Sequence, residues 1–199
     1  MFYLKKISKI IKPGVLIQIS LTFRCMLNCT YCCQAFLLGN RPKVKETNFL
    51  GWVRWFKRFP YKIKEIYVSG GEPTLHPDFV KIVSYLLSQG YFVKVFTNLM
   101  LPDKLIEIPK CYRFSIKTTY HHSQLLSKFN KNYQKVNKKH SIYVDEIESP
   151  QCLSYSILQN LLTGEGNRAD GEDFYDIACL RISPDLHINI NCYELVSDH

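Results

Sequence analysis

Three cysteines lie close together in the stretch Cys25-Met26-Leu27-Asn28-Cys29-Thr30-Tyr31-Cys32. This spacing places three thiols on one short loop. Three thiolates can hold three irons of a cubane [4Fe–4S] cluster, which leaves the fourth iron open to another ligand. A structural zinc site usually needs a second Cys or His pair to complete a tetrahedron, and none follows nearby. The spacing therefore favours an iron–sulfur cluster over zinc.

A glycine pair forms a second candidate site, in Ser69-Gly70-Gly71-Glu72-Pro73. Glycine has no side chain, so the backbone at Gly70 and Gly71 can approach a neighbouring group closely. The cysteine loop and the glycine pair each come directly after an apolar segment, 15–23 and 63–68 respectively, that is typical of a buried strand. The two motifs are therefore expected at the ends of two successive strands.

This combination of motifs resembles the radical S-adenosylmethionine (SAM) superfamily. The resemblance implies that Cys25, Cys29 and Cys32 bind a [4Fe–4S] cluster whose open iron is chelated by the methionine part of SAM. The reduced cluster then donates an electron to the sulfonium, and the resulting 5′-deoxyadenosyl radical abstracts hydrogen from a substrate. The protein binds and orients SAM and the substrate, and it excludes competing reactions. An electron donor such as flavodoxin or ferredoxin is also implied.

The resemblance also assigns residues to SAM. Tyr31 matches the family's aromatic position beside the adenine, or packs within its own loop. Gly70 and Gly71 let backbone approach the methionine group, and Glu72 either meets its ammonium group or orders the loop.

Two later strand ends complete the candidate site. Thr97-Asn98 resembles the polar ending of the family's third strand, with Leu99 in place of the usual glycine. His121 and His122 follow the next predicted strand, where they either contact substrate or form an ordinary loop.

Three polar residues, Ser115, Lys117 and Thr119, alternate along the predicted fourth strand and so share one face of it. If that face points into the site, they can meet the ribose, the SAM carboxylate or substrate. If it points the other way, they meet the outer helices.

Predicted strands alternate with predicted helices along the chain. The strands cover 15–23, 63–68, 91–96, 112–119 and 141–147; the helices cover 49–57 with Thr47 as its cap, 79–87, 105–108, 123–139 and 153–162. Such alternation predicts a parallel α/β sheet with right-handed crossovers. Five strands give an incomplete TIM-like barrel, in which loops at the carboxyl ends of the strands form the site.

The carboxyl-terminal part is expected to be an extension. We assign residues 1–162 to the partial barrel and 163–199 to an acidic loop followed by a hairpin that turns at Pro184-Asp185. Residues 1–140 carry 24 Lys and Arg against 6 Asp and Glu, whereas residues 141–199 carry 2 against 11. The basic part is expected to attract an anionic partner or the acidic tail. The alternative is that these charges lie on solvated faces of the protein and bind nothing.

The length of 199 residues fits one domain and is short for a full eight-fold barrel. A hydrophobic content of 46% excludes a disordered chain. No apolar run reaches the roughly 20 residues of a membrane span, and the metal-type cysteine cluster favours a reducing cytoplasm over a disulfide framework.

Whether a second iron–sulfur cluster is bound is left open by four further cysteines, Cys111, Cys152, Cys179 and Cys192. Cys179 and Cys192 bracket the predicted hairpin, which resembles the auxiliary-cluster extensions of peptide-modifying family members, although Leu186 stands at the turn glycine. The alternative is that these cysteines are small buried apolar residues.

The substrate is also open. A peptide fits the cysteine-bearing hairpin, a nucleobase precursor or a protein glycine fits the short barrel, and RNA fits the basic charge, although no RNA-binding module is visible. The alternative function is a non-catalytic iron–sulfur or zinc scaffold on a degenerate barrel.

Overall fold

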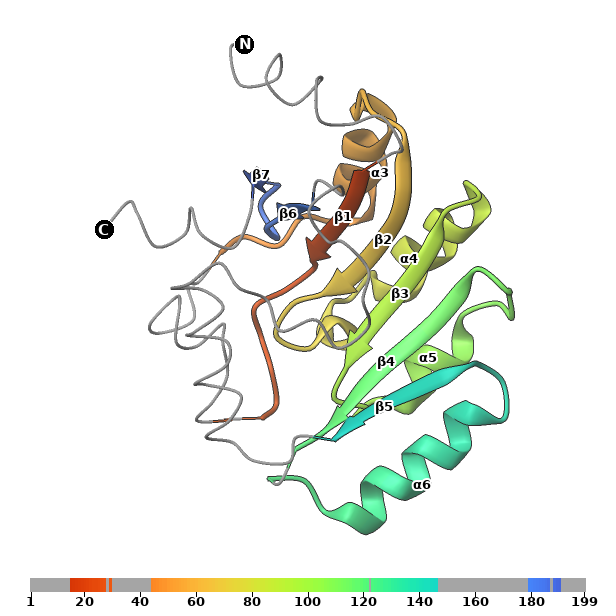
Figure 1. Ribbon diagram of the computed structural model, residues 1–199. Helices are drawn as coiled ribbons and strands as arrows, with labels where there is room; N and C mark the ends of the chain where they lie inside the picture. The colour runs from red at the N-terminus through yellow and green to blue at the C-terminus, as the bar shows by residue number, and fades with distance from the viewer. Residues whose placement is uncertain are drawn as a thin grey trace, which may run out of the picture.

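A single twisted sheet forms the centre of the fold (Figure 1). The computed structural model describes residues 15–27, 29, 44–121, 123–146, 179–186 and 188–190. In these ranges seven strands follow the spatial order β5-β4-β3-β2-β1-β6-β7. They are β1 (Val15–Ser20), β2 (Ile63–Ser69), β3 (Phe92–Thr97), β4 (Phe114–Tyr120), β5 (Ile142–Glu146), β6 (Cys179–Ile182) and β7 (Ile188–Ile190).

Strands β1 to β5 pair in parallel, which confirms the predicted α/β class. The described sheet does not close on itself, as expected of a partial barrel. The helices between the strands are α3 (Phe49–Arg58), the 3₁₀ turn η1 (Pro73–Leu75), α4 (Phe79–Ser88), α5 (Pro102–Glu107) and α6 (Leu126–Asn137). None of the helices in the described ranges combines the length and apolar composition that a membrane crossing requires.

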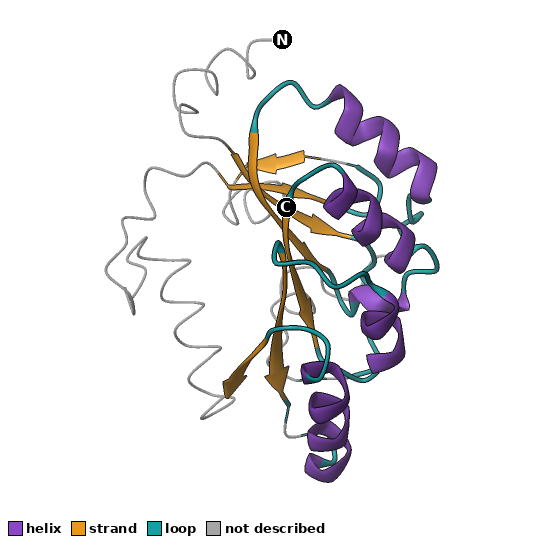
Figure 2. Ribbon diagram, turned by 90° about the vertical axis from the view of Figure 1, so that its right-hand side faces the viewer, coloured by secondary structure: helices purple, strands orange, loops and turns teal. Residues whose placement is uncertain are grey.

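The described helices all cover one face of the sheet (Figure 2). Alternate residues of each strand point to that face, where they meet α3, α4 and α6 in one hydrophobic core. Its fully buried members include Ile17, Ile19, Trp52, Ile66, Val68, Phe79, Leu86, Val95 and Ile116. The opposite face carries aromatic and polar side chains, among them the aligned positions Gln18, Tyr67, Lys94 and Ser115.

Two helix starts differ from the predictions. Helix α3 is capped by Asn48, whose side chain accepts a hydrogen bond from the Gly51 amide, and not by Thr47. Helix α6 begins at Leu126 and not at Ser123. Phe129 and Val136 of α6 are buried against the sheet, whereas Leu126 at its start is exposed.

The carboxyl-terminal hairpin is an extension of the main sheet, because β6 pairs in parallel with β1 and antiparallel with β7. The predicted helix 153–162, the boundary at 162–163, Cys152 and Cys192 lie outside the described residues. Cys111 precedes β4 and Cys179 begins β6, four strands away. At about 4.8 Å per strand this separation is on the order of 19 Å along the sheet, too far for one cluster to bind both.

Asn48 tests the observed cap of α3. Replacing Asn48 with Ala leaves the Gly51 amide without its acceptor, and we expect a loss of about 1 kcal/mol in the free energy of unfolding, measured with urea. Ser123→Ala is the matched control, because α6 begins without a side-chain cap, and we expect a change within about 0.5 kcal/mol. Equal losses in both variants would contradict these helix starts.

Candidate active site at the carboxyl edge of the sheet

Four loops meet at the carboxyl edge of the parallel strands. The cysteine loop follows β1, Gly70-Gly71-Glu72 follows β2, Asn98 follows β3 and His121 follows β4. The parallel register brings these strand ends together, since Ser20 aligns with Ser69 and Thr97 with Thr118. The shared edge that strand order predicts is therefore present.

The glycine loop lies against the backbone that leads into the cysteine loop. The Gly71 amide donates to the Thr22 carbonyl at 2.8 Å, and the Glu72 amide donates to the Arg24 carbonyl at 2.8 Å. A Cβ atom would lie 2.2 Å from the Thr22 carbonyl oxygen if built on Gly70, and 2.2 Å from that of Arg24 if built on Gly71. Both glycines are thus needed for the two loops to meet, before any ligand is considered.

Glu72 is fully buried and joins the glycine loop to the end of β3. One carboxylate oxygen accepts hydrogen bonds from the Thr74 amide at 3.1 Å, the Thr74 hydroxyl at 2.6 Å and the Thr97 hydroxyl at 2.8 Å. The other accepts the Asn98 amide at 2.7 Å. Of the two predicted roles for Glu72, this geometry supports ordering of the loop.

Burial raises the pKa of Glu72, while the hydrogen bonds from Thr74, Asn98 and Thr97 act against that rise. The two backbone amides can only donate, so they favour the ionised carboxylate. Fixed dipoles thus stabilise the carboxylate form of Glu72 against the opposing effect of burial.

Two of the three loop cysteines are described, and a nitrogen lies near each sulfur. Cys25 Sγ is 3.6 Å from Asn98 Nδ2, and Cys29 Sγ is 3.6 Å from His121 Nδ1. Cys32, Tyr31 and His122 lie outside the described residues. Among those described, no three His, Cys, Asp or Glu side chains are grouped closely enough to hold a metal ion.

Leu99 adopts a left-handed backbone, with φ of 62°, where the family's usual residue is glycine. This conformation costs a side-chain-bearing residue roughly 1–2 kcal/mol. The Leu99 side chain is only 1% exposed, and its burial contributes about 1.5–3 kcal/mol. Hydrogen bonds to Thr97 Oγ1 at 3.0 Å and from Asn132 Nδ2 at 2.9 Å hold the turn. Burial and hydrogen bonding therefore offset the missing glycine.

The three alternating residues of β4 point away from the helices, because Phe114, Ile116 and Thr118 between them are buried on the helix side. Their distances from the edge differ. Ser115 lies five residues before Tyr120, or roughly 16 Å at strand rise, whereas Thr119 is next to the strand end. Thr119 is therefore better placed than Ser115 to meet a ligand beside the cysteine loop.

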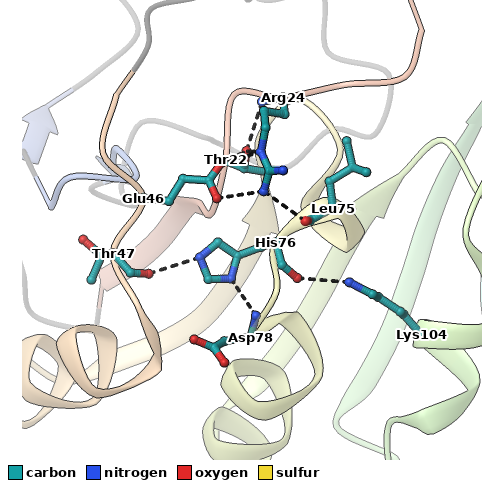
Figure 3. Close-up of polar contacts among 8 residues, drawn as sticks. All are labelled: Thr22, Arg24, Glu46, Thr47, Leu75, His76, Asp78 and Lys104. Carbon is teal, nitrogen blue, oxygen red and sulfur yellow. Dashed lines mark hydrogen bonds and ion pairs between the residues drawn. The ribbon is translucent and has the colours of Figure 1, made fainter.

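Arg24, directly before Cys25, fastens the cysteine loop to residues 44–48 (Figure 3). Its guanidinium donates to both carboxylate oxygens of Glu46 at 2.8 Å and to the Leu75 carbonyl at 3.1 Å. The Thr22 hydroxyl also donates to Glu46. Burial acts to raise the pKa of Glu46, but the bonds from Arg24 and Thr22 outweigh it and the pKa is lowered. Sequence patterns do not reveal this contact between distant segments.

His76 lies beneath this contact and is 1% exposed (Figure 3). The Asp78 amide donates to His76 Nδ1 at 3.1 Å, so Nδ1 must be the acceptor and Nε2 carries the proton that reaches the Thr47 carbonyl at 3.1 Å. Thr47 in turn donates its amide to the Pro184 carbonyl at 2.8 Å, which links the hairpin turn to this network.

Comparison with known proteins identifies the family. The model of the Radical SAM superfamily matches residues 19–143, well over half of the chain. The chain belongs to the radical SAM superfamily. The match includes all four strand ends that meet at the candidate site.

The names of the curated radical SAM relatives indicate different substrates. The chain is 34% identical over 87 residues to 7-carboxy-7-deazaguanine synthase of Aquifex aeolicus, covering 43% of this chain and 36% of that protein. It is 33% identical over 92 residues to PqqA peptide cyclase of Methylocella silvestris, covering 45% of this chain and 24% of that one. It is 28% identical over 155 residues to S-adenosylmethionine-dependent nucleotide dehydratase of Selenomonas ruminantium, covering 74% and 49%. The chain thus spans at most about half of these relatives.

A solved structure shares the fold. Streptococcus suis SuiB bound to S-adenosylmethionine matches with a TM-score of 0.56 at 13% identity, covering all of this chain and 63% of that one. This likeness supports the radical SAM fold of the sheet described above.

Glu72→Gln tests the role of the buried carboxylate in this radical SAM chain. The glutamine amide cannot accept hydrogen bonds through its nitrogen, so at least one buried donor loses its partner. We expect a loss of about 1–3 kcal/mol in the free energy of unfolding, measured with urea. Glu107→Gln, at an exposed position of α5, is the control, with a change within about 0.5 kcal/mol. Unchanged stability in Glu72→Gln would contradict the four hydrogen bonds.

His76 predicts a dependence of stability on pH. Burial lowers the pKa of His76, against the opposing charges of Glu46 and Asp78. The unfolded chain therefore binds more protons just below the ordinary histidine pKa near 6.5, so stability is full above that value and falls as the pH falls through it. One proton limits this slope to about 1.4 kcal/mol per pH unit.

Urea unfolding between about pH 7.5 and pH 5 measures that slope. We expect His76→Gln, which does not titrate, to give a shallower decline. The decline that remains includes His140, whose pKa is also lowered by burial. An equal slope in wild type and His76→Gln would show that His76 is not held neutral.

Proposed function

We propose that this chain uses a [4Fe–4S] cluster on Cys25, Cys29 and Cys32 to cleave SAM reductively. The observation that carries the proposal is the direct contact between the two motifs, because the glycine loop is hydrogen-bonded to the backbone before Cys25. Family membership supports the same chemistry. When bound, the reduced cluster supplies one electron to the SAM sulfonium, which yields the 5′-deoxyadenosyl radical that takes hydrogen from substrate.

The described residues fit such a cluster. Cys25 and Cys29 are half-buried, and neither is in a disulfide with another described residue. Asn98 Nδ2 lies 3.6 Å from the sulfur of Cys25, and His121 Nδ1 lies 3.6 Å from the sulfur of Cys29. N–H groups near sulfur stabilise thiolate, the form that binds iron.

The chain's own residues then have distinct tasks. Glu72 fixes the glycine loop to the end of β3, and Arg24 with Glu46 fixes the backbone before Cys25. Gly70 and Gly71 keep the two loops in contact, so that backbone polar groups are held at the cluster edge for the methionine part of SAM. Thr97 is committed to Glu72 and acts through it, whereas Thr119 and Lys117 face the side away from the helices and are positioned toward SAM or substrate.

The substrate class follows from the relatives only in outline. Their names include a peptide cyclase, a deazaguanine synthase and a nucleotide dehydratase. We therefore keep peptide and nucleobase-type substrates as the two candidates for hydrogen abstraction, with flavodoxin or ferredoxin as the electron donor.

Anaerobic reconstitution tests the function. We expect the wild-type chain to hold about four irons and, with strong reductant, to release 5′-deoxyadenosine from SAM. Replacing Cys25, Cys29 and Cys32 together with Ala should abolish the cluster absorbance and the product. Cys111→Ala is the control and should retain both, because Cys111 precedes β4 at the opposite edge of the sheet. A wild-type cluster without SAM cleavage would favour the non-catalytic scaffold.

A further inference from the structure

Two side chains reach the proposed cluster ligands from neighbouring strand ends. Asn98 follows β3 and places Nδ2 3.6 Å from Cys25 Sγ. His121 follows β4 and places Nδ1 3.6 Å from Cys29 Sγ. These separations suit N–H···S hydrogen bonds, which are longer than N–H···O bonds because sulfur is the larger atom. Both nitrogens are donors when His121 carries its proton on Nδ1.

The side-chain amide of Gln124 is hydrogen-bonded to the backbones of both residues. Gln124 is only 8% exposed. Its Oε1 accepts the His121 amide at 3.0 Å, and its Nε2 donates to the Asn98 carbonyl at 2.7 Å. The backbone N–H of Gln124 also donates to the His121 carbonyl at 2.8 Å, which closes the turn after β4. Gln124 therefore sets the spacing between the two backbones that present donors to sulfur.

The Asn98 side chain is fixed from its other end as well. Asn98 Oδ1 accepts the Met100 amide at 3.1 Å, so the rotation that would turn Nδ2 away from Cys25 is restricted. The Asn98 amide itself donates to Glu72. The donor to Cys25 is thus held by both the glycine loop and the turn after β3.

We propose that Asn98 and His121 donate hydrogen bonds to the thiolates of Cys25 and Cys29 and so raise the reduction potential of the cluster, with Gln124 as the residue that positions them. This inference rests on the proposed function, because it requires the cluster. Reduction adds one negative charge that is shared with the sulfurs. N–H dipoles aimed at sulfur stabilise that added charge more than they stabilise the oxidised state.

Redox titration of the reconstituted full chain, followed by the electron paramagnetic resonance of the reduced cluster, tests the inference. At the wild-type midpoint potential we expect His121→Leu to lower the ratio of reduced to oxidised cluster about tenfold, which for one electron corresponds to about 59 mV. His121→Asn retains a nitrogen donor near the Nδ1 position and should recover most of that ratio. Gln124→Leu loosens both donors and should also lower it.

Gln89→Leu is the matched control for Gln124→Leu. Gln89 is an exposed residue at the carboxyl end of α4, before the start of β3, and its side-chain amide donates to Ser88 Oγ at 3.4 Å. We expect its midpoint potential to match wild type. A ratio in His121→Leu within about twofold of wild type, or equal losses in His121→Asn and His121→Leu, would overturn the role of His121 as a donor.

A second measurement covers the case in which His121→Leu fails to take up the cluster. Wild-type protein labelled with ¹⁵N-histidine should show a nitrogen coupling to the reduced cluster, together with a proton coupling that disappears in D₂O. Absence of both couplings would overturn the inference. A wild-type chain that forms the cluster and cleaves SAM but fails these tests loses only this inference, whereas a wild-type chain without a cluster loses the proposed function too.

Discussion

The buried carboxylate of Glu72 is the interaction on which the site depends. It is removed from water and held by donors from its own loop and from the end of β3. A buried charge is tolerable only when hydrogen bonds replace its hydration, so the loop cannot shift without exposing or orphaning that charge. The amide of the same residue binds the Arg24 carbonyl. Glu72 thus fixes the glycine loop simultaneously to β3 and to the cysteine loop.

Close contact between the backbones of the glycine loop and the cysteine loop is the second constraint, and it gives the glycine pair a structural role. In the family interpretation these glycines make room for SAM. In this chain the first atoms that a Cβ would meet are the carbonyl oxygens of Thr22 and Arg24. The absence of side chains at Gly70 and Gly71 is therefore already required by loop-to-loop contact, and any approach to SAM uses backbone that this contact holds in place.

A chain of contacts also connects the carboxyl-terminal hairpin with the cysteine loop. Pro184 accepts the Thr47 amide, the Thr47 carbonyl is bonded to His76, and Glu46 beside Thr47 binds Arg24. The Arg24–Glu46 pair is partly exposed, and such pairs contribute about 0–1 kcal/mol, so its main effect is on position. The arrangement means that the hairpin supports the site through residues 44–48.

The sequence by itself determined the family, the alternation of strands and helices, and the edge where the motifs meet, because these depend on local spacing and periodicity. It did not determine which face of β4 points away from the helices, that Arg24 binds Glu46, or that Gln124 joins Asn98 to His121. Those features arise from packing between segments far apart in the chain, such as Asn98 and Gln124, which are 26 positions apart. Only the tertiary structure decided them, since one buried amide or carboxylate selects its partners by proximity in space.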